Sequence, residues 1–161
     1  MKKKGFTLIE AVIAIVITAI IALAIATYIR EGIEAWRFLS GQKSLALTSR
    51  AAMNRVVKEL RRVRRSTNIT TWTSQEMTFL DVETQTVTFS QEGTSLLRNG
   101  EILLDNLEDP GGLQFSYLDS DGSPAEDSSD IALVRCKLTV VKNDNRFILE
   151  SAARIRVKRI K

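Results

Sequence analysis

Hydrophobic residues are concentrated in one uninterrupted run near the start of the chain, which begins MKKKGFTLIEAVIAIV. Residues 11–29 form a stretch of nineteen positions without a charged side chain. At 1.5 Å per residue, a helix over this stretch is roughly 28 Å long, close to the thickness of the hydrocarbon core of a bilayer. The pattern therefore predicts one membrane-spanning helix, with Lys2, Lys3 and Lys4 on its cytoplasmic side.

A second pattern follows, in which small or apolar residues recur at spacings of three and four. Its members are Leu45, Ser49, Ala52, Val56, Leu60 and Val63. This spacing is typical of one face of an amphipathic helix that packs on a folded domain. No proline occurs before Pro110, so we expect one helix over residues 6–65. Gly32 and Gly41 are its expected weak points, since glycine costs about 1 kcal/mol relative to alanine in a helix.

Beyond Trp72 apolar and polar residues alternate, which predicts β-strands. Asn99 and Gly100 lie between two apolar runs and predict a hairpin. Residues 109–112 predict a turn before a strand over residues 113–118, and residues 143–145 predict a turn before the last strand. Met77 and Phe79 alternate with polar residues, as do Val87 and Phe89. The residues expected to form one inward face are Val134, Cys136, Leu138 and Val140. An N-terminal helix on a mostly antiparallel sheet is an α+β fold.

Charge is separated into blocks along the 161 residues, whose formal net charge is +4. Residues 30–65 hold ten basic and three acidic side chains, a balance of +7. Residues 76–130 hold one basic and thirteen acidic side chains, a balance of −12, and residues 131–161 hold nine basic and two acidic, again +7. Such separation indicates electrostatic complementarity, either within the fold or between copies of it.

The composition lacks the residues and motifs on which the common kinds of enzyme site depend. The chain has no histidine, and its single cysteine, Cys136, allows no internal disulfide and no cysteine metal cluster. No GxGxxG or GxxxxGK[ST] stretch is present to bind a phosphate. We therefore expect no enzyme activity and no cofactor. We expect Cys136 to be a small buried hydrophobic residue, with a redox or linking role as the alternative.

Glu10 is an acid at the head of the apolar run. A carboxylate in a membrane helix costs about 2.5–3.5 kcal/mol on insertion scales, so it usually has a partner. A plain signal anchor gives it none. A cleaved secretory signal would use Ala24-Ile25-Ala26 as its cleavage site, but its apolar region is usually shorter than this run, and Glu10 would lie inside it.

The stretch Gly5-Phe6-Thr7-Leu8-Ile9-Glu10, after a short lysine leader and before an apolar helix, resembles the class III signal of type IV pilins and type II secretion pseudopilins. The resemblance implies that a prepilin peptidase cuts after Gly5 and methylates the new amine of Phe6. It also implies that Glu10 pairs with this amine, in its own chain or in the adjacent subunit of a filament. Major pilins often carry a proline where this chain has Thr27, which indicates a straighter helix here.

Within residues 96–140 the strings LLRNGEILLDNLEDPGGLQFSYLDSDG and DIALVRCKLTV are similar to minor pseudopilins of the J type and to W-type minor pilins. The resemblance implies a pilin-like α+β fold with four parts. They are a leader over residues 1–5, a transmembrane or filament-core half-helix over 6–29, an amphipathic half-helix over 30–66, and a periplasmic β-rich domain over 67–161.

The function implied is that of a minor pseudopilin that initiates or caps the periplasmic pseudopilus of a type II secretion system. The alternatives are a type IV pilus minor pilin that primes assembly, for adhesion, motility or DNA uptake, and a signal-anchored extracytoplasmic binding module. The implied location is the inner membrane, crossed once. The implied partners are the prepilin peptidase, other major and minor pilins or pseudopilins, the inner-membrane assembly platform and, before assembly, membrane lipid.

Three further groups of residues have competing interpretations. The sequence Arg61-Arg62-Val63-Arg64-Arg65 could bind nucleic acid or lipid, but without interleaved aromatic residues we expect no nucleic acid. We expect these cations to interact with the C-terminus of the helix and with nearby acidic loops. Trp36 and Phe38 fit either a membrane-interface belt or a filament contact.

The third group is an acidic turn that resembles a calcium loop only in part. Its candidate ligands are Asp119, Asp121, Asp127 and Asp130. Pro124 occupies the position of the EF-hand glycine, and Asp130 is shorter than the glutamate expected at the twelfth position. A solvated turn is the favoured interpretation, with calcium as the alternative.

Overall fold

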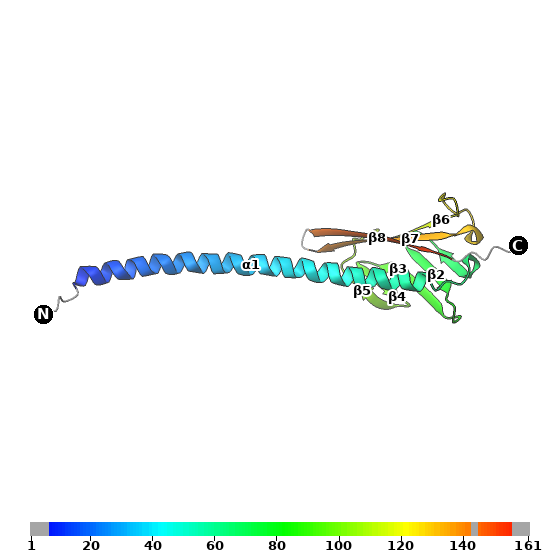
Figure 1. Cartoon of the computed structure of the whole chain (residues 1–161). Helices are drawn as coiled ribbons and strands as arrows, with labels where there is room; N and C mark the ends of the chain where they lie inside the picture. The colour runs from blue at the N-terminus through cyan, green and yellow to red at the C-terminus, as the bar shows by residue number, and fades with distance from the viewer. Residues whose placement is uncertain (1–6, 143–144, 156–161) are drawn as a thin grey trace. The chain divides into compact units, whose positions relative to one another are not determined.

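The computed structural model describes residues 7–142 and 145–155 (Figure 1). Within these residues, one helix is followed by eight strands and two short 3-10 turns. The elements are α1 (Leu8–Leu60), η1 (Ser66–Asn68), β1 (Ile69–Trp72), β2 (Glu76–Leu80), β3 (Thr86–Glu92), β4 (Ser95–Arg98), β5 (Glu101–Leu104), β6 (Leu113–Leu118), η2 (Ser128–Asp130), β7 (Leu133–Lys142) and β8 (Asn145–Arg154). Helix precedes strands throughout, and every described strand pair is antiparallel, so the predicted pilin-like α+β class is confirmed.

The chain divides into two compact units, Met1–Lys43 and Ser44–Lys161. The described part of the first unit is helical after Thr7, and its apolar side chains are exposed. The second unit contains the end of α1 and all the strands. The predicted weak points at Gly32 and Gly41 do not interrupt α1, which continues through both as one helix.

α1 ends at Leu60, five residues before the predicted end. The amide N–H groups of Arg62 and Val63 bond to carbonyls three residues back, at 2.9 and 3.2 Å, which tightens the last turn. Val63 then forms an antiparallel bridge with Asp81, so the chain enters the sheet region instead of extending the helix. A tertiary contact therefore overrides the helical pattern of this segment.

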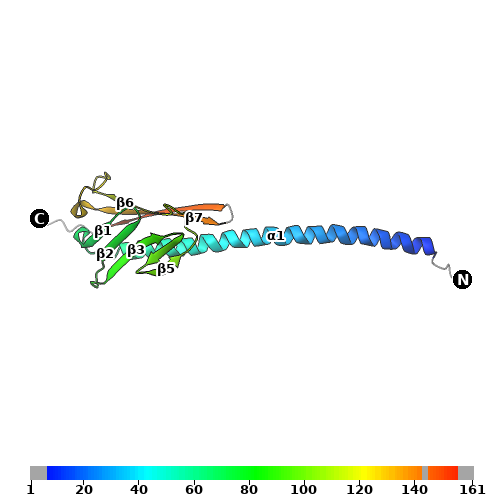
Figure 2. The same cartoon turned by 180° about the vertical axis from the view of Figure 1, so that it is seen from behind.

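The first sheet has the order β1-β2-β3-β4-β5, several strands of which are seen from behind in Figure 2. The hairpin between β4 and β5 turns at Asn99 and Gly100, whose φ angles of 52° and 83° are those required at the two central positions of a type I′ turn. The Asn99 side-chain oxygen also accepts a hydrogen bond from the Thr88 amide at 2.7 Å. The predicted hairpin is therefore confirmed.

The second sheet has the order β6-β7-β8. β6 has the predicted bounds, and its register places Phe115 opposite Cys136 and Tyr117 opposite Val134. The inward residues of β7 are fully buried, as predicted; they are Val134, Cys136, Leu138 and Val140. The predicted turn at 143–145 falls partly on Asn143 and Asp144, which lie outside the described residues.

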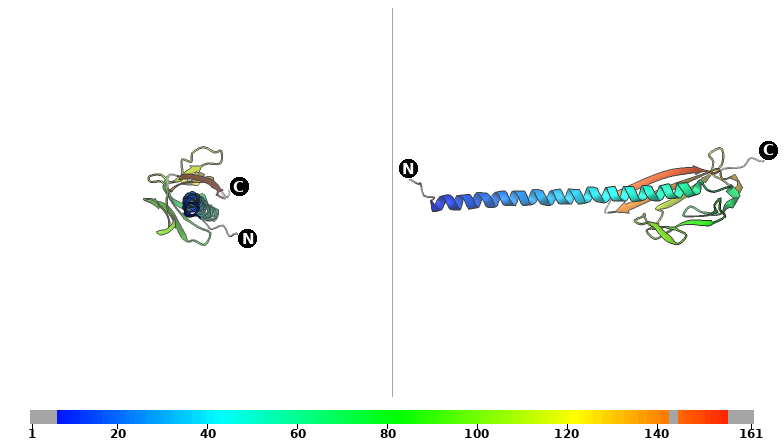
Figure 3. Two further views of the ribbon diagram at one scale, coloured as in Figure 1. Left: turned by 90° about the vertical axis from the view of Figure 1, so that its left-hand side faces the viewer. Right: turned by 60° about the horizontal axis from the view of Figure 1, so that its bottom comes forward.

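Both sheets contribute to one hydrophobic core with the last four turns of α1. In Figure 3 the two sheets lie on different sides of this part of the helix, and the remaining side of it is uncovered. The predicted helical stripe is buried throughout, with Ser49 donating its hydroxyl to the Leu45 carbonyl at 2.7 Å. The helix therefore packs on the strands through the face that the sequence pattern predicts.

The strands form two sheets, whereas the sequence pattern predicts one. Gln91 connects the end of β3 to the start of β6: its amide nitrogen donates to the carbonyls of Gly93 and Glu108, and its oxygen accepts from the Leu113 amide, each at 2.8 Å. Gly112 lies directly beside Glu108 in this connection. A single side chain thus satisfies three backbone groups where the chain passes from one sheet to the other.

Candidate functional site

The N-terminus of α1 is closed by a reciprocal cap between Thr7 and Glu10. The Glu10 carboxylate oxygen Oε2 accepts hydrogen bonds from the Thr7 amide at 2.9 Å and from its hydroxyl at 2.8 Å. The Thr7 hydroxyl oxygen accepts from the Glu10 amide at 3.4 Å. This is a capping box, and a threonine followed three residues later by a glutamate is its sequence signature. The cap is a role of Glu10 that the membrane argument alone does not predict.

The predicted cleavage and methylation site, Gly5 and Phe6, lies outside the described residues. Glu10 is described, and the hydrogen bonds found for its carboxylate in the described part of the chain all involve Oε2. Oε1 accepts no hydrogen bond from the residues that the structure describes. The capping box orients the carboxylate at the first turn of α1, next to the segment that leads to Phe6.

The apolar part of α1 satisfies its own polar side chains. The Thr18 hydroxyl donates to the Ala14 carbonyl at 2.7 Å, and the Thr27 hydroxyl donates to the Ala24 carbonyl at 2.7 Å. The most apolar 18-residue window of the helix has a mean hydropathy of 2.9 and none of it is buried. Such a segment is suited to lipid or to other apolar helices, because its backbone and hydroxyl groups need no outside partner. It fits a single-pass membrane anchor.

The segment after the apolar run carries both charges and exposed aromatic rings. Arg30 and Glu34 form an exposed ion pair at 3.1 Å, one turn apart. Trp36 is 70% exposed and Phe38 is 53% exposed. Both rings are therefore available for a membrane interface or a neighbouring subunit, and the two interpretations remain predictions.

The four arginines that follow α1 differ in their surroundings. Arg62 pairs with Asp81 at 3.0 Å and with Glu83 at 2.6 Å, as the interpretation based on nearby acidic loops predicts. Arg61, Arg64 and Arg65 are exposed and form no ion pair with any described residue. That interpretation therefore holds for one of the four arginines.

Asp81 is the buried acid of this group, and its carboxylate is held by the turn that follows β2. Its Oδ1 accepts from the amides of Gln85 at 3.0 Å and Glu83 at 2.8 Å. The hydrogen bond from the Gln85 amide, with smaller contributions from the Glu83 amide and the Arg62 charge, holds the pKa of Asp81 below its ordinary value. The structure thus keeps this carboxylate ionised, with one cation beside it.

The acidic turn uses its carboxylates to support its own backbone. Asp119 Oδ1 accepts from the amides of Asp121 and Ser123, each at 2.9 Å, and Asp127 Oδ1 accepts from the Ser129 amide at 3.3 Å. Among the described residues no three acidic, cysteine or histidine side chains lie together as a metal-binding group. The four aspartates named as calcium candidates are therefore not gathered into one site, and their hydrogen bonds are those of a turn.

Cys136 lies in the middle of β7 and is fully buried. Burial raises the pKa of its thiol to about 12, so the thiolate that would act as nucleophile or metal ligand does not form at neutral pH. Tyr117 on the neighbouring strand β6 also has a raised pKa, mainly because of burial, and its hydroxyl donates to the Thr73 carbonyl at 2.9 Å. Cys136 belongs to the hydrophobic core, and Tyr117 is partly buried and packs against it.

Comparison with known proteins identifies one matching family model, the prokaryotic N-terminal methylation motif, over residues 1–26. The match spans the leader, the capping box and most of the apolar run. No curated protein and no solved structure matched the chain. The motif supports a structural, type IV pilin-like protein that is processed by a prepilin peptidase and assembles with other pilins.

Proposed function

We propose that this chain is a minor pseudopilin, a structural subunit that initiates or caps the periplasmic pseudopilus of a type II secretion system. The observation that carries the proposal is the position of Glu10. It lies at the first turn of an exposed apolar helix, within the residues that match the N-terminal methylation motif. The finer assignment to minor pseudopilins draws on the resemblance of residues 96–140 to the J type.

In this proposal the prepilin is inserted with its lysines in the cytoplasm and is cut after Gly5. The amine of Phe6 is then methylated, and it remains cationic. It lies four residues before Glu10, within about one helical turn. Because the capping box uses only one of the two carboxylate oxygens, Glu10 can accept a hydrogen bond from this amine, or from that of an adjacent subunit, without losing its cap.

Assembly exchanges lipid for protein around the apolar part of α1. Lipid tails are as apolar as the helix, so this exchange supplies little hydrophobic driving force. The charge of Glu10 favours assembly, because it is unfavourable in lipid and favourable beside a neighbour's amine. A subunit that enters the filament at the correct register therefore gains an ion pair that other registers lack. We further propose that the folded Ser44–Lys161 unit lies in the periplasm.

A second candidate function is that of a type IV pilus minor pilin that primes pilus assembly. The same motif and the same helix support it, and the resemblance to W-type minor pilins favours it. A signal-anchored binding module, the candidate from another class, would need neither cleavage after Gly5 nor a cation near Glu10. The systems differ in the partner subunits, so copurified pilins or pseudopilins separate the first two.

The experiment that tests the proposal is mass spectrometry of the N-terminal peptide from protein purified out of the host membrane. We expect a peptide that begins with methylated Phe6. A matched Gly5→Val variant should retain Met1, because a branched side chain hinders a protease that must grip extended backbone. An unmodified Met1 or a start at Thr27 in the natural chain would contradict the proposal.

A further inference from the structure

The uncovered face of α1 in the second unit is basic. Its exposed residues follow one another at spacings of three and four; they are Leu47, Arg50, Asn54, Lys58 and Arg61. Arg61 continues the helical geometry, because its amide bonds to the Val57 carbonyl at 3.1 Å. These residues therefore share one side of the helix, away from the stripe that packs into the core. We call them the basic face.

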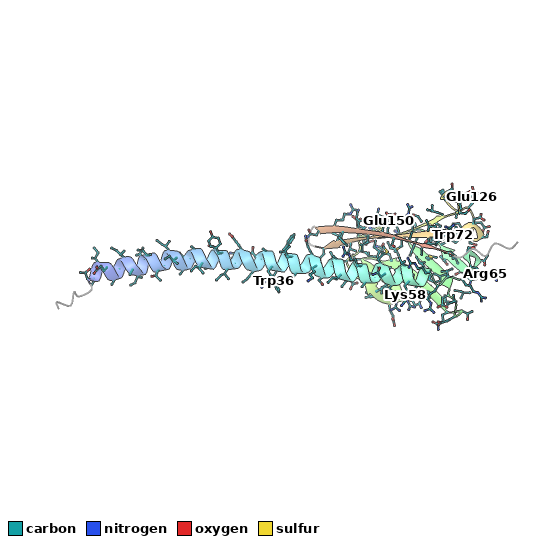
Figure 4. The ribbon with its side chains drawn as sticks, viewed as in Figure 1. Trp36, Lys58, Arg65, Trp72, Glu126 and Glu150 are labelled. Carbon is teal, nitrogen blue, oxygen red and sulfur yellow. The ribbon has the colours of Figure 1, made fainter. Side chains whose placement is uncertain are left out.

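The cations of the basic face are not matched by acids of the same chain. Arg50, Lys58 and Arg61 form no ion pair with any residue that the structure describes. Figure 4 shows Lys58 on α1, apart from the acid Glu126. Asp144 is the only acidic side chain outside the described ranges. One acid at most therefore remains for three cations.

A helix face with this charge discriminates between neighbours. The described helix exposes no acidic side chain between residues 35 and 60, because Glu59, the only acid there, is buried. A second copy that laid this part of its own helix along the basic face would bring cations against cations, which is unfavourable. Leu47, which is 57% exposed, adds apolar area to a contact that the charges make selective.

We propose that the basic face receives the helix of a different pilin-like subunit, one that carries acidic side chains at spacings of three and four. The same charges exclude a second copy of this chain from that position. The inference rests on the proposed function and refines it, because a minor subunit that initiates or caps a filament must contact other subunits and must not repeat itself. Charge on one face of α1 is sufficient to impose this rule.

An acidic helix fits the basic face better than other anionic partners do. Arg50 and Lys58 lie about 12 Å apart along the axis, so acids two turns apart on an adjacent parallel helix would face both. The N-terminal motif supports assembly with other pilins, whose helices would lie alongside α1. The face carries no aromatic side chain, on which the bases of a nucleic acid would stack.

The first test uses the chain itself, with its face reversed, as the acidic probe. One tagged full-length copy combines Arg50→Glu, Lys58→Glu and Arg61→Glu, and Asn54→Cys is placed both in this copy and in a differently tagged copy with the natural charges. In detergent we expect this mixed pair to form a disulfide roughly fivefold more than two natural faces do. Salt at about 0.5 M should remove the difference. Equal yields, or a higher yield for two natural faces, would overturn the inference.

The matched control moves the cysteine off the basic face. With Ile102→Cys, a 65% exposed position on β5, reversal of the three charges should leave the yield unchanged. A yield that rises there as well would overturn the assignment to the basic face, because the attraction would then not depend on position. Unchanged resistance to protease shows that the reversed copy folds.

The second test identifies the neighbour in the membrane of the host. A photoreactive amino acid replaces Asn54 in the full-length chain, and the attached peptide is read by mass spectrometry. We expect the N-terminal helix of a different subunit, with acidic residues around the point of attachment. The yield should fall roughly fivefold after Arg50→Glu with Lys58→Glu, and it should persist after Arg50→Lys with Lys58→Arg, which keeps the charge.

Attachment to a second copy of this chain, to lipid, to nucleic acid or to a peptide without acids would overturn the inference, and so would no attachment. The N-terminal mass is read in the same samples. Methylated Phe6 without the expected attachment overturns this inference alone, whereas an unprocessed N-terminus contradicts the proposed function.

Discussion

Arg98 Nε donates to both carboxylate oxygens of Glu59, at 2.9 Å to each, and so joins β4 to the end of α1. Glu59 is only 8% exposed, and its Oε1 also accepts from Arg55 Nε at 2.7 Å. The acid is thus held between two cations, Arg55 of the same helix and Arg98 of β4. A buried carboxylate of this kind is tolerated because its charge is paired and its oxygens are hydrogen-bonded.

Replacing Arg98 by alanine should destabilise the second unit strongly. Glu59 would stay buried with one cation instead of two, so we expect the free energy of unfolding to fall by about 2–4 kcal/mol. Urea unfolding of the full chain in detergent, followed by tryptophan fluorescence, measures this. Arg135→Ala is the matched control, because its pair with Glu150 is about half exposed on both sides and should contribute under about 1 kcal/mol. Equal losses would contradict the role of Glu59.

Gly112→Ala should also destabilise the second unit. A Cβ at this position would lie 2.5 Å from the Glu108 carbonyl oxygen and 2.6 Å from its amide nitrogen, so backbone would have to move. We expect a loss of about 2–3 kcal/mol in the same unfolding measurement. Gly41→Ala meets nothing within 4 Å and should not lower stability, since alanine is the better helix former. A Gly112→Ala variant as stable as the natural chain would contradict the close approach.

The carboxylate of Asp81 predicts a particular dependence of stability on pH. Its pKa is lower in the folded protein than its ordinary value of 3.8, so ionisation favours the folded state. This contribution is complete above the ordinary value and is lost as the pH falls through the folded pKa. Asp81→Asn, which cannot ionise, should be less stable than the natural chain at pH 7, and the two should converge below pH 3.8. Unfolding at several pH values checks this, and a difference that grows on acidification would contradict it.

The parts of the fold that follow from local pattern were predictable. The spacing of Leu45 to Leu60 predicted the packed helix face, and Asn99-Gly100 predicted its hairpin, because each depends on a few neighbouring residues. Contacts between distant residues were not predictable. No periodic pattern in the sequence indicates the bridge of Val63 to Asp81 after the helix, the pair of Glu59 with Arg98, or the division into two sheets.

The candidate site was predictable where it depends on a motif. The register of Glu10 with the apolar run is local, and so is the Thr7–Glu10 cap, which the Thr-x-x-Glu spacing is sufficient to predict. The absence of ion pairs around Arg50, Lys58 and Arg61 within the described chain was not predictable, because it depends on which side of the domain each acid occupies. Cleavage after Gly5 and methylation of Phe6 stay predictions.

Cys136 should be inert toward thiol reagents in the folded protein. It is fully buried, so a reagent cannot reach the thiol. Burial also raises the pKa of this thiol to about 12, so little of the reactive thiolate is present at pH 8. We expect labelling by a maleimide to be slower by about a hundredfold or more than in urea. An introduced cysteine at Ile102, which is 65% exposed, is the positive control. Rapid labelling of both would show that β7 opens readily.

Glu10 and Thr7 allow the charge of the carboxylate to be separated from its role as a cap. Glu10→Gln keeps an oxygen that can accept from Thr7 but removes the charge, whereas Thr7→Val removes the hydroxyl and keeps the charge. Incorporation of each variant into filaments, measured by competition with the natural chain in one cell, compares the two effects. Methylation of Phe6 is measured in parallel, so that a processing defect is not mistaken for an assembly defect.

We expect Glu10→Gln to be incorporated roughly tenfold less than the natural chain and Thr7→Val to be incorporated almost equally. The cap is worth about 1 kcal/mol, but it is present in lipid and in the filament alike, so its loss changes neither state relative to the other. The surroundings of the charge differ between the two states, because the amine of a neighbouring subunit lies beside it in the filament and not in lipid. Equal incorporation of Glu10→Gln, or a larger defect in Thr7→Val, would therefore mean that Glu10 serves the helix end and does not set the register of assembly.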